Sequence, residues 1–208
     1  DVLEGLDGHD DLQGGDGNDT IRGGGGNEFM TGDVGTDSTN YCDAGAGVNV
    51  NLSTLAAQNT GGAGIDTLSG VENLTGSNFA DTLQGDGAAN VIDGRFGDDT
   101  MRGFGGSDFL FGGDGIDFIQ GGDATDYIDG GDGNDNWLAG DAGNDFVTGL
   151  GGNDRIDGGD GDDLLQGNFG DDQLSGDDGN DNPTAGGNDR LEGGSGRDVL
   201  EGEAGNDP

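Results

Sequence analysis

The sequence is poor in the residues that ordinarily hold a small protein together. Of its 208 residues only 28% are hydrophobic and 6% aromatic, and the mean hydropathy is −0.62. So little apolar surface is typical of disorder, because its burial does not offset the conformational entropy lost on folding. Cys42 is the only cysteine, so no disulfide within the chain can replace the missing core. Composition alone therefore predicts an unfolded chain.

Positive charge is also scarce. Six Lys and Arg residues stand against 44 Asp and Glu, giving a formal net charge of −38 at pH 7. This balance argues against nucleic acid as a partner, because phosphate backbones are bound by basic surfaces. No apolar run approaches the roughly 18 residues of a membrane span, and the first residues do not resemble a signal peptide. We therefore expect neither a nucleic-acid partner nor a membrane span.

Glycine and aspartate are abundant, and they recur with a period of nine residues. Residues 14–22 read GGDGNDTIR, which generalises to G-G-x-G-x-D-x-U-x with U apolar. A period of this kind predicts a repeat architecture rather than a disordered chain. The sixth position of the unit falls at Asp1, Asp10, Asp19, Glu28, Asp37, Asp81, Asn90, Asp99, Asp108, Asp117, Asp126, Asp135, Asp145, Asp154, Asp163, Asp172, Asp181, Asp189, Asp198 and Asp207.

The eighth position of the unit is apolar in almost every copy. Two slips disturb the count. One residue is inserted near Ala139, and one is lost near Pro183, which itself stands at an eighth position. The other eighth positions are Leu3, Leu12, Ile21, Met30, Leu83, Ile92, Met101, Leu110, Ile119, Ile128, Trp137, Val147, Ile156, Leu165, Leu174, Leu191 and Leu200.

Each part of the unit has a physical reading. Glycines at the first, second and fourth positions can adopt positive φ and let carbonyl oxygens crowd around an ion. The last three residues, as in Phe118, Ile119 and Gln120, are long enough for a very short strand whose middle side chain points inward. Two units then make one 18-residue coil with a strand on each side and a turn at each edge. Aspartates stacked about 5 Å apart along such edges repel unless cations lie between them.

The unit resembles the repeats-in-toxin (RTX), or haemolysin-type, calcium-binding repeat over roughly residues 1–40 and 76–208. The resemblance implies an all-β fold, a right-handed parallel β-roll with 18 residues per coil, and several Ca²⁺ ions as cofactors. It divides the chain into a first repeat block (1–40), a linker (41–75) and a second, longer block (76–208). It also implies a secreted, extracellular bacterial protein exported by type I secretion. The leading expectation is a non-catalytic module that folds on calcium; the alternative is the repeat region of a secreted metalloprotease, lipase, polysaccharide-modifying enzyme, adhesin or toxin.

The resemblance further implies a ligand set for each ion. One turn supplies its Asp and the carbonyls of its second and fourth residues, and the next turn on the same edge supplies its Asp and the carbonyls of its first and third. The three sites written out in this way are Gly113, Gly115 and Asp117 with Gly130, Asp132 and Asp135; Gly122, Ala124 and Asp126 with Gly140, Ala142 and Asp145; and Gly15, Gly17 and Asp19 with Gly32, Val34 and Asp37. The remaining expected ligands are Asp10, Asp81, Asp99, Asp108, Asp154, Asp163, Asp172, Asp181, Asp189 and Asp198. Sites at Glu28 and Asn90, which are not Asp, are expected to be weaker.

Other chemistry receives little support from the sequence. Paired carboxylates can act as general acid and base, but their strict period indicates ligands instead. His9 occupies a fifth position and is expected to be an exposed turn residue, and Cys42 is expected to pack within the linker. A single imidazole and a single thiol disfavour zinc and other softer metals. We therefore expect no catalytic residues.

Two features lie outside the repeat itself. In the linker, residues 48–52 alternate like a half-buried strand, and residues 61–68 read as a loop returning to a repeat-like half. In the second block, Phe109, Tyr127 and Phe146 should stack on one outer sheet face, as an aromatic ladder or as a docking strip for a sugar surface or a missing domain. Both ends of the chain cut a repeat, so we expect a covalent neighbour domain in a longer protein.

Overall fold

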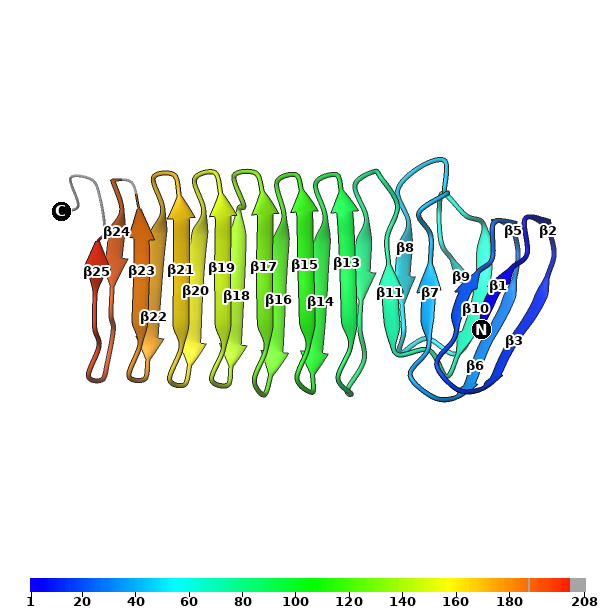
Figure 1. The fold of residues 1–208 in the computed structure, drawn as a ribbon, viewed down its shortest axis with the longest axis horizontal. Helices are drawn as coiled ribbons and strands as arrows, with labels where there is room; N and C mark the ends of the chain where they lie inside the picture. The colour runs from blue at the N-terminus through cyan, green and yellow to red at the C-terminus, as the bar shows by residue number, and fades with distance from the viewer. Residues whose placement is uncertain (187, 203–208) are drawn as a thin grey trace.

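The computed structural model describes residues 1–186 and 188–202, so the repeat position at Asp207 lies outside the described residues. Within them every regular element is a β-strand, and in the repeat blocks strands 17 to 19 residues apart pair in parallel along one long axis (Figure 1). For example, β15 pairs with β17 so that Leu110 lies opposite Ile128. The expected all-β parallel roll is therefore confirmed. No helix in the described part of the chain is long and apolar enough to cross a membrane.

Two long sheets form the opposite walls of the roll. The 11-stranded sheet contains, in spatial order, β1 (Val2–Glu4), β4 (Thr20–Arg22), β7 (Ser38–Asn40), β11 (Asn73–Thr75), β13 (Val91–Phe96), β15 (Phe109–Asp114), β17 (Tyr127–Asp132), β19 (Phe146–Gly151), β21 (Leu164–Phe169), β23 (Asn182–Gly186) and β25 (Glu201–Gly202). The 8-stranded sheet contains β8 (Asn49–Asn51), β12 (Thr82–Gln84), β14 (Thr100–Gly105), β16 (Phe118–Asp123), β18 (Trp137–Ala142), β20 (Arg155–Asp160), β22 (Gln173–Asp178) and β24 (Arg190–Glu192).

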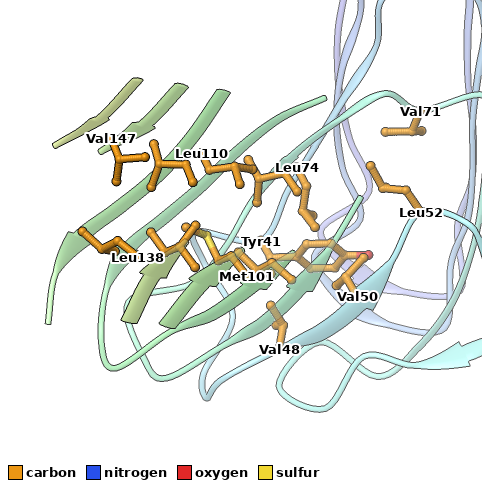
Figure 2. Packing of buried hydrophobic residues seen from close by; sticks show 14 of the residues in the cluster. Tyr41, Val48, Val50, Leu52, Val71, Leu74, Met101, Leu110, Leu138 and Val147 are labelled. Carbon is orange, nitrogen blue, oxygen red and sulfur yellow. The ribbon is translucent and has the colours of Figure 1, made fainter. Parts of the chain in front are cut away.

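The core is a double row of side chains between these walls. Figure 2 shows Leu74, Leu110 and Val147 from the 11-stranded sheet above Met101 and Leu138 from the 8-stranded sheet. All five are at most 1% exposed, and three of them, Met101, Leu110 and Val147, are eighth positions expected to face inward. An outermost coil departs from this pattern, because Leu200 is half exposed. Each inner coil thus contributes only two large apolar side chains to the interior, which confirms a thin core.

The strands are longer than the three residues that the sequence predicts. In the regular part of the roll they span six residues, as in Phe118–Asp123. The ladder continues through the first three residues of the next unit, where Gly122 lies opposite Asp141, although Gly122 has a φ of 119°. Only three residues then remain for the turn. The left-handed second position also carries side chains, at Leu6, Asp33, Arg95, Phe104, Asp141, Leu150, Asn168 and Asp177.

The position assigned to Trp137 is wrong. Phe118 lies opposite Trp137 and Ile119 lies opposite Leu138, so Trp137 is an outward-facing seventh residue and the buried Leu138 takes the eighth position. The inserted residue is the exposed Asn136 rather than one near Ala139. The sequence pattern did not distinguish these positions, because an apolar side chain at 137 or 138 satisfies the period equally well. On the outer surface of the 8-stranded sheet, the Arg155 guanidinium lies 4.3 Å from the Trp137 ring centre. Pro183 does occupy an eighth position, opposite Leu165.

The segment 41–75, which we call the interruption, affects the two walls differently. The 11-stranded sheet is unbroken, because β11 pairs with both β7 and β13. The other wall is split: β8 begins the 8-stranded sheet, and a separate sheet contains β3 (Asp11–Asp16), β6 (Phe29–Val34), β10 (Ile65–Ser69) and β9 (Gln58–Asn59). The expected alternation at 48–52 is present, with Val48, Val50 and Leu52 buried. A short pair, β2 (Asp7–Gly8) and β5 (Gly25–Gly26), lies at the N-terminal end (Figure 1).

Candidate metal-binding turns

The sixth-position aspartates stack into a hydrogen-bonded column along each edge of the roll. The backbone N–H of Asp117 donates to Oδ1 of Asp135 one coil further on, at 2.9 Å, and that of Asp99 donates to Oδ1 of Asp117 at 2.8 Å. The side chains are buried because they fold back under their own turns. One carboxylate oxygen therefore has a structural role. The same bond links Asp19 to Asp37, Asp81 to Asp99, Asp108 to Asp126, Asp126 to Asp145, Asp135 to Asp154, Asp145 to Asp163, Asp154 to Asp172, Asp163 to Asp181, Asp172 to Asp189 and Asp181 to Asp198.

The second carboxylate oxygen is different, because in most of these residues it is buried without a hydrogen-bond partner. A buried anionic oxygen with no partner is costly, so such atoms require a cation or a proton. This open oxygen is Oδ2 of Asp10, Asp19, Asp37, Asp99, Asp108, Asp117, Asp126, Asp135, Asp145, Asp154, Asp163, Asp172 and Asp181.

The first glycine of each unit keeps a space beside this oxygen. A Cβ on Gly112 would collide with Oδ2 of Asp117 and with the carbonyl oxygen of Gly130 from the next coil. Gly112 does not have a positive φ, so here the sequence prediction is wrong about the cause: glycine is required for room. Positive φ does explain the second glycine, since Gly113 has a φ of 105°. A carboxylate oxygen and a carbonyl oxygen from adjacent coils therefore converge on one small space.

The structure brings together the turns of all three sites written out from the sequence. The N–H of Gly115 donates to the carbonyl of Asp132 at 2.9 Å, and Ala124 and Gly17 make the equivalent bonds to Ala142 and Val34 at 2.7 and 2.8 Å. Each carbonyl oxygen retains a second lone pair. The donor set is thus made of hard oxygen atoms from carboxylates and carbonyls, which suits Ca²⁺. The individual ligands remain a proposal.

Side-chain clusters of the kind that bind transition metals are absent from the described residues, where no group of three or more His, Cys, Asp or Glu side chains is placed to hold an ion. Backbone carbonyls must supply the remaining ligands, as they do for calcium. His9 is exposed and its ring lies 3.2 Å from the carbonyl of Asn27, and Cys42 is half-buried beside Asn40. Neither side chain is near another group that would form a softer metal site.

Burial raises the pKa of these carboxyl groups. For Asp99, desolvation raises the pKa to about 8, with hydrogen bonding from Asp81 opposing the shift and neighbouring carboxylates adding to it. Desolvation likewise raises the pKa of Asp126 and Asp135 to about 7, and that of Asp117 to about 6. Without an ion, these turns therefore bind protons more readily than exposed carboxylates do, because little positive charge lies beside their oxygens.

The turns of Asp81 and Asn90 close without an open oxygen. Asp81 accepts from the N–H groups of Val48 and Ser77 at 2.7 and 2.6 Å and from the Ser77 hydroxyl at 2.7 Å. The side-chain amide of Asn90 donates to the carbonyl of Glu72 at 2.7 Å and accepts from the N–H of Asp86 at 2.9 Å. Both carboxylate oxygens of Asp81 are therefore occupied, and Asn90 presents an N–H where most other turns present an oxygen.

Glu28 and Asp66 form the turn pair that sequence reasoning judged least well. Glu28 is 1% exposed, both of its carboxylate oxygens lack partners, and desolvation with Asp66 nearby raises its pKa to about 8. Asp66 continues the column, because its Oδ1 accepts from the N–H of Glu28 at 3.1 Å. The signal for Asp66 was present, since residues 61–69 read GGAGIDTLS. It was missed because residue 66 falls 38 residues after Glu28, out of step with the period of nine.

A comparison with known protein families agrees with this geometry. No curated protein matches the chain. The family that matches is the RTX calcium-binding nonapeptide repeat, over residues 4–38, 68–101, 102–136, 135–165, 148–182 and 184–207. These segments cover most of the sequence, and the β-roll supplies the turns that this repeat requires. The chain therefore belongs to the family of RTX calcium-binding nonapeptide repeats.

Proposed function

We propose that the chain is a non-catalytic module that folds when Ca²⁺ ions bind between successive turns outside the cell. One observation carries the proposal: open carboxylate oxygens are buried at turn after turn, several of them beside a carbonyl of the next coil, as for Asp117 and Gly130. Calcium supplies a divalent charge that accepts several such oxygens in tolerant geometry. The turns would hold it through their sixth-position carboxylates and the carbonyls named above.

Electrostatics connects ion binding to folding. Like charges about 5 Å apart repel by roughly 3 kcal/mol at an effective dielectric constant of about 20, and the columns repeat this arrangement along both edges. With so thin a core, burial cannot offset that repulsion. Because the sites exist only in the folded roll, the free energy of ion binding adds to the free energy of folding.

The same linkage supports an extracellular location. Extracellular calcium modules bind with dissociation constants of about 10⁻⁴–10⁻³ M, far above cytosolic calcium. A chain of this kind stays expanded and anionic in the cytosol, suitable for type I secretion from a bacterium, and becomes rigid outside. A covalent neighbour, such as an enzyme, toxin or adhesin domain, would carry any catalytic activity.

The proposal is tested by following the far-ultraviolet circular dichroism and the radius of gyration of the whole chain during a calcium titration at pH 7.5. We expect an expanded chain in chelator and a compact, β-rich one in millimolar calcium, with magnesium as the control ion. A chain that is equally compact and ordered in chelator contradicts the proposal.

A second candidate function is docking through the aromatic strip. The Tyr127 ring stacks on Phe146 at 5.1 Å with an angle of 7° and on Phe109 at 5.8 Å with 29°, and Phe111 adds a tilted contact at 5.8 Å. Phe109 is half exposed, which favours a contact surface. However, these rings cover one another's faces, which favours a ladder over a sugar platform. Changing Phe109 and Tyr127 to Ser, with partner and sugar binding as the readout, separates the two.

A further inference from the structure

The interruption returns one turn to the edge of the first coils. Residues 61–64 lead into β10, which pairs in parallel with β6 (Figure 1). Leu68 lies opposite Met30, and both side chains are buried. The turn that precedes β10 lies between the segments that match the family, which leave residues 39–67 uncovered. An apparent spacer therefore carries a repeat-like turn in the register of the roll.

The hydrogen bonds of this turn match those of the regular coils. The N–H of Gly26 donates to the carbonyl of Ala63 at 3.0 Å, which is the bond that Gly115 makes to Asp132 at 2.9 Å. The N–H of Thr67 donates to the carbonyl of Glu28 at 2.8 Å, as the N–H of Phe118 donates to the carbonyl of Asp99 in the regular roll. Fourth-position glycines also meet, since a Cβ on Gly64 would collide with the carbonyl oxygen of Gly26. The two turns therefore stack with the geometry of a regular turn pair.

Glu28 directs an open carboxylate into this turn pair. Its Oε2 lies beside Gly23 and its Oε1 beside Gly26, both in its own turn, and neither oxygen has a hydrogen-bond partner although the residue is 99% buried. Opposite it, Asp66 is fully buried and fixed in place. Its Oδ2 accepts from the hydroxyls of Tyr41 at 3.2 Å and Thr60 at 2.9 Å. The interruption thus supplies the groups that hold the second carboxylate of the pair.

We propose that the turns 23–28 and 61–66 form a further Ca²⁺ site, with Glu28 as its principal side-chain ligand, and that this site fastens the interruption to the first coils. The inference rests on the proposed function, because it assumes that calcium binds between stacked turns. The interruption then belongs to the ion-binding edge of the roll. The longer Glu side chain, in the place of Asp, reaches the site from a turn whose partner lies 38 residues away.

The test compares Glu28→Gln with Glu4→Gln, which removes the same charge from an exposed residue paired with Arg22. Calcium stoichiometry is measured by equilibrium dialysis and amide hydrogen exchange by mass spectrometry, both on the whole chain in saturating calcium. We expect Glu28→Gln to bind one ion fewer than wild type and to exchange at least tenfold faster within 41–75, while 91–186 stays protected. Glu4→Gln should match wild type.

Two further variants keep the inference falsifiable if Glu28→Gln folds poorly. Glu28→Asp restores the usual residue and should retain the ion. Asp66→Asn keeps the acceptor for the N–H of Glu28 but removes the second negative charge of the turn pair, so it should also lose the ion. Unchanged stoichiometry and exchange in both Glu28→Gln and Asp66→Asn overturn this inference alone. A wild-type chain that binds no calcium overturns the proposed function as well, so the two failures are distinguishable.

Discussion

Two adjacent regions of the roll close their turns in different ways. In residues 91–186, the regular roll, buried carboxylates such as those of Asp117 and Asp135 keep one oxygen open. In residues 72–90, the closed segment, Asp81 is satisfied by Ser77, and Asn90 bonds to the carbonyl of Glu72. The backbone path is similar, because β11 and β12 pair in register with the regular strands. The difference teaches that this fold can seal a turn by side-chain hydrogen bonds, and that the open oxygens elsewhere need a cation or a proton.

Removing calcium should separate the two regions most strongly. In chelator at pH 7.5 we expect amide exchange to become fast throughout the regular roll, because its columns lose their counterions. The closed segment, which contains buried Leu74 and adjoins buried Val50 and Val71, should keep measurably slower exchange. Hydrogen exchange resolved by peptide checks this expectation, and uniform exchange across both regions would contradict it.

Filling one ion space should be the next largest effect. Gly112→Ala places a methyl group against Asp117 Oδ2 and the Gly130 carbonyl, and overpacking of this kind costs about 1–3 kcal/mol in the free energy of unfolding, here with loss of an ion. The matched control is Gly87→Ala in the closed segment, where a Cβ meets nothing within 4 Å. Calorimetric unfolding in calcium gives both values. Equal destabilisation by the two changes would show that the space at Gly112 has no special role.

Acid should partly replace calcium in the regular roll. Burial raises the pKa of Asp99 to about 8 and those of Asp126 and Asp135 to about 7, against 3.8 ordinarily. The folded, ion-free roll therefore binds more protons than the unfolded chain between about pH 4 and pH 8, so its free energy of unfolding falls as pH rises through that window. Circular dichroism in chelator should show more β-structure at pH 4.5 than at pH 7.5. An ion-free signal that is independent of pH would refute this.

The smallest effect should come from converting a closed turn into an open one. Asn90→Asp replaces the N–H that bonds to the Glu72 carbonyl with an oxygen, so the variant should bind one additional calcium ion. Asn134→Asp adds the same charge at an exposed fifth position, where the side-chain oxygen already accepts from Asn153, and should add none. Isothermal titration calorimetry gives the stoichiometry, and an unchanged count in Asn90→Asp would remove the distinction between the two kinds of turn.

The fold could be predicted from the sequence because the nine-residue period fixes which side chains face inward. Ile119 and Ile128 are buried on opposite walls for this reason alone. The prediction failed where the period is ambiguous: apolar residues at both 137 and 138 allow two registers, and the packing selects Leu138. The length of the strands was also wrong, since pairing of Gly122 with the next coil does not depend on any side chain.

The candidate site was predictable to the same degree. The column of aspartates followed from the period, as did the adjacency of the turns that contain Asp117 and Asp135. Which oxygens remain open did not follow, because it depends on contacts from residues outside the unit, such as Ser77 on Asp81. Asp66 was not predicted, because an inserted loop places it 38 residues after Glu28 in the sequence, although its turn still stacks directly on the turn of Glu28.

The aspartate column gives the roll a chemical polarity. Each bond runs from a backbone N–H to the carboxylate of the following coil, as from Asp99 to Asp117 and from Asp117 to Asp135. The C-terminal face of each coil therefore presents N–H donors, and the facing side of the next coil presents carboxylate acceptors. A coil added in the C-terminal direction brings its carboxylate to an N–H that is already in position, so a folded coil is a template for its successor. The two ends of the roll therefore offer different groups to an added coil: backbone N–H donors at the C-terminal end and carboxylate oxygens at the N-terminal end.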